Sequence, residues 1–258
     1  MGPRHTITES AINHEVRFPV RDTSLGGLLD IPPAAEGIVL FVNGTGSGRF
    51  NPRNQFVAER LRQSGLATLQ IDLLTPEEEL NDDAARQLRF DIRFLAGRLC
   101  DAVDWLSNSR QTRQFPIGVL AANTGAGAAL VAAARAPIQI KAVVSRGGRP
   151  DLAGDSLRRV ACPTLLIVGG NDGIVIDLNH HALAELAAPK KQLVVVPAAG
   201  QLFEEPGTLE QVADLAASWL TSHLSGGTPA APRSSPSVGN PSVGKDSLAG
   251  GSHVPQST

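Results

Sequence analysis

Segments with the pattern of strands alternate with segments with the pattern of helices along most of the chain. The run Gly-Ile-Val-Leu-Phe-Val at 37–42 is continuously apolar, which is typical of a strand covered on both faces. The helical pattern is clearest at 84–107, where one stripe contains Leu88, Ile92, Leu95, Leu99 and Val103. The expected strands are 16–20, 25–31, 37–42, 67–74, 117–122, 141–145, 163–168 and 192–197, with the first two as edge strands. The expected helices are 54–64, 84–107, 124–134, 151–160, 177–187 and 209–223.

This alternation predicts an α/β fold with a doubly wound, mostly parallel sheet and helices on both faces. Functional groups gather at the carboxyl ends of the strands in such sheets. The connections are too short for a cap domain. We expect one domain at 14–223, a flexible N-terminus at 1–13, and a disordered tail at 224–258, which is rich in Gly, Ser and Pro.

Residues 116–127 read as a buried strand, a sharp turn and a helix packed through small residues. The turn has the small-x-nucleophile-x-small pattern that holds a catalytic side chain above a sheet. Ala121 and Gly125 are its small residues, but Asn123 occupies the nucleophile position. An amide is a very weak nucleophile, yet Asn tolerates the positive φ of such a turn. We therefore expect the backbone geometry to be kept and the chemistry to be lost.

Five segments in order along the chain carry a resemblance to a known family: 43–48, 121–125, 145–151, 168–172 and 199–206. Together they make residues 16–223 resemble the compact α/β-hydrolases of the dienelactone-hydrolase-like group. That family typically has His-Gly in the oxyanion loop, a Ser or Cys nucleophile, an Asp and a His base. The matching positions here are Asn43-Gly44, Asn123, Asp172 and Gln201, so the resemblance implies a degenerate triad in which only the acid remains.

The resemblance also implies an oxyanion hole formed by backbone N–H groups of Thr124 and of the Gly44-Thr45 segment. Our leading hypothesis is a pseudohydrolase used for ligand binding, partner binding or regulation, because a serine nucleophile needs an adjacent base. The alternative is an active hydrolase, lyase or isomerase acting on a small ester, lactone or carbonyl compound. It would use Asp172 as general base, or a water held by Asn123 and Gln201. A purely structural or interaction role is a third reading.

Other candidate side chains have plainer interpretations. His180 and His181 are expected on the outer surface of a helix, and His223 at the opposite end of the sheet. Ser145 lacks the small residue two positions before it that an elbow requires, and Cys162 reads as core filling. The glycine-rich segment 44–48 lacks the Lys of a phosphate-binding loop, so no nucleotide cofactor is expected.

Arginines follow two of the predicted strand ends, Arg49 and Arg53 after one, and Arg146 and Arg149 after the other. Guanidinium groups there would clamp a carboxylate or phosphate ligand. The alternative is that they fasten loops through ion pairs with acids such as Asp151, Glu204 and Glu205.

Composition and charge limit the kinds of partner that we expect. The chain of 258 residues is 42% hydrophobic and has a formal net charge of −2, which gives no reason to expect nucleic acid or an anionic membrane. The two cysteines form no disulfide framework and have no metal-ligand spacing, so a cytoplasmic protein without metal or cofactor is expected.

Overall fold

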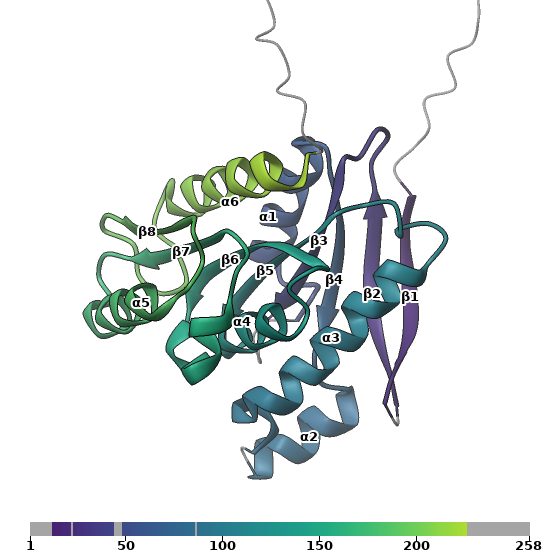
Figure 1. The fold of residues 1–258 in the computed structure, drawn as a ribbon, viewed down its shortest axis with the longest axis horizontal. Coiled ribbons are helices and arrows are strands. Elements are labelled where there is room, and N and C mark those ends of the chain that lie inside the picture. Colours follow the sequence, from purple (N-terminus) through teal and green to yellow (C-terminus); the bar gives the residue numbers. More distant parts are fainter. Residues whose placement is uncertain (1–11, 22, 44–47, 86, 226–258) are drawn as a thin grey trace, which may run out of the picture. The chain divides into compact units, whose positions relative to one another are not determined.

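The computed structural model describes residues 12–225, apart from residues 22, 44–47 and 86. Its centre is an eight-stranded sheet with the order β1-β2-β4-β3-β5-β6-β7-β8 (Figure 1). The strands are β1 (Ile12–Val20), β2 (Thr23–Ile31), β3 (Gly37–Asn43), β4 (Leu66–Asp72), β5 (Ile117–Asn123), β6 (Ile140–Gly148), β7 (Thr164–Gly169) and β8 (Lys191–Val196). β1 and β2 are antiparallel to their neighbours, and the strands from β4 to β8 are parallel, as predicted.

Helices cover both faces of the sheet (Figure 1). They are α1 (Pro52–Gln63), α2 (Pro76–Ala85), α3 (Ile92–Asn108), α4 (Thr124–Arg135), α5 (Gly173–Glu185) and α6 (Thr208–Leu224), with 3₁₀ helices η1 (Leu88–Phe90) and η2 (Pro150–Arg159). The two faces are visible in β3, where Leu40 packs in the core beneath α3 and α4 and Phe41 in the core beneath α1 and α6. This alternation explains why the strand is apolar at every position.

Three expectations about individual elements are wrong. β2 is not an edge strand, because it pairs with β1 on one side and β4 on the other. The expected helix at 84–107 falls in three elements, the end of α2, η1 and α3. The Asp91 carboxylate accepts a hydrogen bond from the Phe94 N–H at 2.9 Å and caps the start of α3. The expected helix at 151–160 is a 3₁₀ helix kinked at Gly154, whose φ is 51°.

The expected tail at 224–258 and most of the expected N-terminus at 1–13 lie outside the described residues, so both stay predictions. Within the described part of the chain, no helix has both the length and the hydrophobicity needed to cross a bilayer. In the same part, no group of three His, Cys, Asp or Glu side chains is arranged to hold a metal ion.

Candidate functional site

The turn from β5 to α4 has the backbone conformation of a nucleophile elbow. Asn123 has φ 50° and ψ −131° and caps the N-terminus of α4. Gly125 sits where an added Cβ would lie 3.3 Å from the Val42 side chain of β3, so the start of α4 packs closely against the sheet. The expectation that the elbow geometry survives the loss of its nucleophile is confirmed.

The end of β6 is held against this elbow. The Asn123 carbonyl accepts a hydrogen bond from the Arg149 N–H at 3.0 Å. A Cβ at Gly148 would collide with Ser145 Oγ and with the Ala126 methyl group, so only glycine fits. Ser145 is fully buried at this point, which agrees with a structural role rather than nucleophilic attack.

Gln201 lies beside Asn123, as the family pattern predicts for the base and the nucleophile. Its Nε2 donates a hydrogen bond to Asn123 Oδ1 at 3.3 Å. The loop that carries Gln201 approaches β6 closely, because a Cβ at Gly147 would lie 2.6 Å from the Gln201 carbonyl oxygen. The two positions are therefore brought together, and both side chains are amides that do not titrate near neutral pH.

Asp172 follows β7 and stands at the N-terminus of α5. The adjacent Asn171 N–H donates to the Ala199 carbonyl at 2.9 Å, which ties this turn to the loop leading to Gln201. The Asp172 side chain is half-buried. Among the described residues, no hydrogen bond or ion pair involves its carboxylate. The acid position is thus present near the site, without a base to orient.

The expected oxyanion hole is described only in part. Thr124 is the first residue of α4, is 9% exposed, and has a buried Oγ1 without a partner. Free backbone N–H groups at a helix N-terminus favour a partial negative charge. Asn43 ends β3 beside Asp72, but its side chain, Gly44 and Thr45 lie outside the described residues. Their part in an oxyanion hole stays a prediction.

The described histidines that we weighed as catalytic bases lie away from the elbow. His180 and His181 are exposed on α5. The His223 ring hydrogen-bonds the Trp219 carbonyl at 2.7 Å near the end of α6. The next residue, Leu224, packs against Gly37, the first residue of β3. His223 therefore lies at the amino ends of the parallel strands, opposite to the elbow.

The arginines at this edge of the sheet fall into two groups. Three form ion pairs that fasten loops: Arg49 with Asp72 at 2.6 Å, Arg53 with Glu204, and Arg149 with Asp151 at 2.7 Å. Arg146 is different, because its Nη2 donates to a neutral acceptor, Asn54 Oδ1, at 2.7 Å. Burial, together with the smaller effect of the nearby charge of Arg53, lowers the pKa of the Arg146 guanidinium to about 10.

Sequence reasoning missed three residues around Arg146. Asn54 of α1 is 1% exposed, and Gln70 of β4 is fully buried. The Phe41 ring centroid lies 5.9 Å from the Arg146 guanidinium carbon. One sequence signal could have indicated this cluster: Gln70 is a polar residue inside the apolar strand Leu-Ala-Thr-Leu-Gln-Ile-Asp. A buried polar side chain normally has a hydrogen-bond partner, so Gln70 predicts other polar groups nearby.

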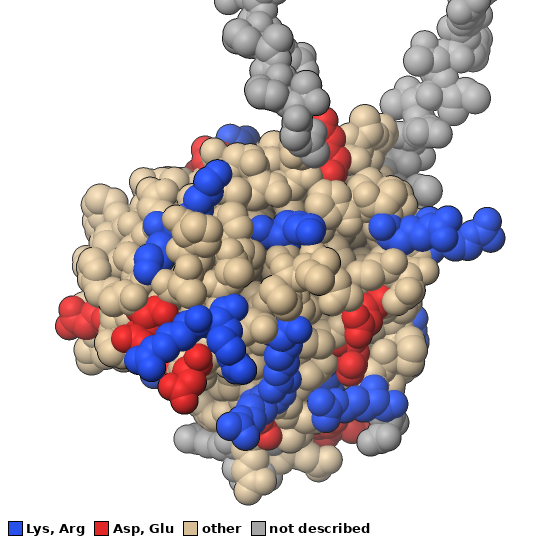
Figure 2. All heavy atoms as spheres, in the orientation of Figure 1, with Lys and Arg blue, Asp and Glu red and all other residues tan. Residues whose placement is uncertain are grey.

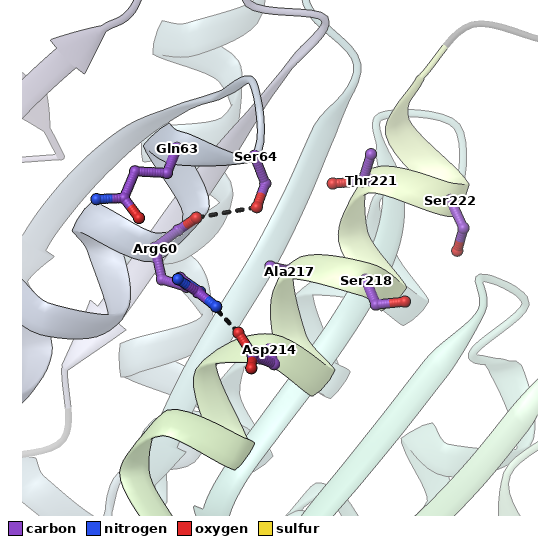
Figure 3. Close-up of a pocket in the computed structure, with 8 residues that line it drawn as sticks. All are labelled: Arg60, Gln63, Ser64, Asp214, Ala217, Ser218, Thr221 and Ser222. Carbon is purple, nitrogen blue, oxygen red and sulfur yellow. Dashed lines mark hydrogen bonds and ion pairs between the residues drawn. The ribbon is translucent and has the colours of Figure 1, made fainter. Parts of the chain in front are cut away.

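Two hollows are formed by described residues of the helical layers. One of about 560 Å³ lies between α1 and α6, where Arg60 Nε and Asp214 Oδ1 bridge the two helices at 2.6 Å (Figure 3). The other, of about 770 Å³, lies among α3, α4 and η2 and is lined in part by Arg93, Arg135 and Arg159. Lys and Arg side chains gather over these three elements on the face shown in Figure 2.

Solved structures of other proteins share this fold. The crystal structure of dienelactone hydrolase from Anabaena variabilis is 53% identical, with a TM-score of 0.80, over 83% of this chain and 99% of that one. Est1E from Butyrivibrio proteoclasticus shares the fold at 15% identity and a TM-score of 0.66, over 81% of this chain and 98% of its own. The dienelactone hydrolase-like promiscuous phosphotriesterase P91 from metagenomic libraries shares it at 16% identity and a TM-score of 0.65, over 83% and 99%.

Two curated relatives are longer than this chain. Two Mycobacterium tuberculosis proteins, from strains CDC 1551 and H37Rv, bear the name "Putative phosphoribosyl transferase" and are 53% identical over 217 residues. The match covers 84% of this chain and 48% of theirs, so the chain spans about half the length of these relatives. No family model matches the chain. The eight-stranded sheet, the elbow and the near-complete match to the Anabaena enzyme show that the chain belongs to the dienelactone hydrolase group of the α/β-hydrolase fold.

Proposed function

We propose that this domain is a pseudohydrolase, which binds a small molecule at the elbow and does not cleave it by the serine-hydrolase route. The observation that carries the proposal is the hydrogen bond from Gln201 Nε2 to Asn123 Oδ1 at 3.3 Å. It joins two amides at the positions where the family's mechanism needs a nucleophile and its base. Covalent catalysis needs the nucleophile to lose a proton to that base, and neither amide supports this step.

The preserved backbone supports a binding role. Asn123 keeps a positive φ, and α4 begins at Thr124 directly after it. The N–H groups at this helix start provide donors for a carbonyl or oxyanion group of a ligand. Solved structures with this fold are named as a dienelactone hydrolase and an esterase domain, so a small ester, lactone or related carbonyl compound is the proposed class of ligand.

A second candidate function rests on Asp172. Its carboxylate is half-buried and, among the described residues, has no hydrogen-bond or ion-pair partner. A carboxylate without such a partner is free to take a proton from a substrate or from water. In this alternative the domain is a hydrolase, lyase or isomerase whose general base is Asp172.

Hydrolysis of p-nitrophenyl acetate tests both functions. We expect the natural chain to show only background turnover, and the double variant Asn123→Ser, Gln201→His to exceed it by about 100-fold or more, since nucleophile and base act as a unit. Each single variant should stay near background for the same reason. Adding Asp172→Asn to the double variant should remove about 100-fold of the gained rate, because the histidine loses its orienting acid.

The outcomes separate the candidates. Turnover by the natural chain that disappears in Asp172→Asn would establish the Asp172 mechanism and overturn the pseudohydrolase proposal. Silence of a correctly folded double variant would show that the elbow is not a preserved hydrolase site. The matched control for folding is Asp155→Asn, an exposed acid of η2 outside the three tested positions, which should change neither rate.

A further inference from the structure

Arg146 carries a buried positive charge that no carboxylate neutralises within the described residues. The residue is 9% exposed, and its Nη2 donates to the neutral Asn54 Oδ1 at 2.7 Å. Its Nη1 is buried and has no hydrogen-bond partner. Removing a charged group from water is strongly unfavourable unless an opposite charge or several hydrogen bonds compensate for it.

The neighbouring arginines show that this edge of the sheet does not lack acids. Arg49, Arg53 and Arg149 each pair with a carboxylate, although all three are more exposed than Arg146. The charge of Arg53 also acts on Arg146 and disfavours its cationic form. The most deeply buried of the four guanidinium groups is therefore the one that the chain leaves without a counter-charge.

The surroundings of Arg146 have the composition of a binding site. Arg146 pairs in register with Ala122, whose small side chain lets the guanidinium extend across β5 toward the Phe41 ring of β3. Gln70 of β4 is the register partner of Phe41, and its buried Nε2 has no acceptor. Two unsatisfied donors therefore flank one aromatic ring beneath α1, which supplies Asn54.

We propose that Arg146 anchors an anion-binding site beneath α1, which takes the carboxylate or phosphate group of a small-molecule ligand. A guanidinium presents two parallel N–H donors to such a group, and one of them is unoccupied here. The inference deepens the proposed function and rests on it, because Ala122 directly precedes Asn123 and places the anion site next to the elbow.

Binding of defined probes tests the site. Isothermal titration calorimetry would compare phenyl phosphate, phenylacetate and the neutral isostere phenylacetamide on the natural chain and on Arg146→Met, Arg146→Lys and Arg158→Met. We expect one of the two anions to bind, about 10-fold or more tighter than phenylacetamide, and the preferred anion identifies the natural group. Arg146→Met should weaken that binding by about 10- to 100-fold, and Arg146→Lys by less.

The control is Arg158, whose side chain is 68% exposed and pairs with Glu185, so Arg158→Met should bind like the natural chain. Thermal unfolding separates a structural role from a binding role. If Arg146 served only to stabilise the fold, Arg146→Met would melt at a lower temperature than the natural chain. If Arg146 is an uncompensated buried charge, Arg146→Met should melt at an equal or higher temperature.

Failure to bind either anion, or equal binding by folded Arg146→Met, would overturn the anion site. The proposed function would stand if the double variant still gained esterase activity. If an anion binds through Arg146 but the double variant gains no esterase activity, only the proposal that the elbow is an inactivated hydrolase site is overturned.

Discussion

Asn123 holds φ 50° and ψ −131°, a sparsely populated conformation that costs a residue with a side chain about 1–3 kcal/mol. In an active hydrolase this strain presents the nucleophile, and in this chain the strained position carries an amide side chain. Asn123→Gly would relieve the strain. It would also add about 0.4–1 kcal/mol of unfolded-state entropy and remove the exposed hydrogen bond from Gln201, worth about 0.5 kcal/mol.

The balance predicts that Asn123→Gly raises the free energy of unfolding by about 1 kcal/mol, or the melting temperature by about 2–4 °C for a domain of this size. The chain supplies its own reference, since Gly154 has φ 51° and ψ −134° and an added Cβ there would meet nothing within 4 Å. Gly154→Asn therefore places asparagine in the same backbone conformation without a clash at Cβ. It should lower stability by about 1 kcal/mol.

Guanidinium denaturation of both single variants and of the double variant measures these effects. The slope of the transition should stay constant, and the two changes should cancel in the double variant, because distant sites add. A loss of stability in Asn123→Gly would refute the reasoning and show that the Asn123 side chain makes interactions worth more than its strain. If Gly154→Asn does not lower the free energy of unfolding, this backbone conformation does not strain asparagine, and the reasoning fails at its first step.

Three further predictions concern the scaffold. Glu78→Gln should lower stability by about 3 kcal/mol at pH 7, because Arg98 is 5% exposed and would lose its carboxylate partner. The hydrogen bond from Arg98 holds the pKa of Glu78 below its usual range, so this stabilisation is complete above the ordinary carboxyl pKa and is lost as pH falls through the lowered pKa of Glu78. Gly169→Ala should cost about 3 kcal/mol by thermal unfolding, because its Cβ would meet the Ala199 carbonyl at 2.5 Å and backbone cannot yield cheaply. The Cys162 thiol, whose pKa burial raises to about 11, should resist a disulfide reagent at pH 8 until the protein unfolds.

Each of these has an outcome that would contradict it. A stability difference between natural chain and Glu78→Gln that stays constant down to pH 3 would show that the pair does not depend on an ionised Glu78. Full stability of Gly169→Ala would mean that the loop after β8 shifts freely. Rapid labelling of two thiols in the native protein would show that Cys162 is accessible, since Cys100 is the other free cysteine.

Local sequence patterns were sufficient for the strands of the sheet, for several of the helices and for the elbow. The apolar run of β3 follows from burial on both faces, and the small residues Ala121 and Gly125 follow from the tight turn between β5 and α4. These are short-range effects of sterics and burial, which act on neighbours along the chain. The boundary at Asp91 was missed because one side-chain cap interrupts an apolar stripe that otherwise continues.

The pairing of charges was decided only by the tertiary structure. Arg53 and Glu204 are 151 positions apart, and Arg146 reaches Asn54 across 92 positions. No local pattern distinguishes an arginine that will find a carboxylate from one that will not, since the partner depends on which loops the sheet brings together. The sequence by itself determined that two amides, Asn123 and Gln201, stand at the family's nucleophile and base positions, because the chemistry of a side chain is set by residue identity alone. Only the fold showed that Arg146 is buried beside them without a counter-charge, because burial and pairing are properties of the packed chain.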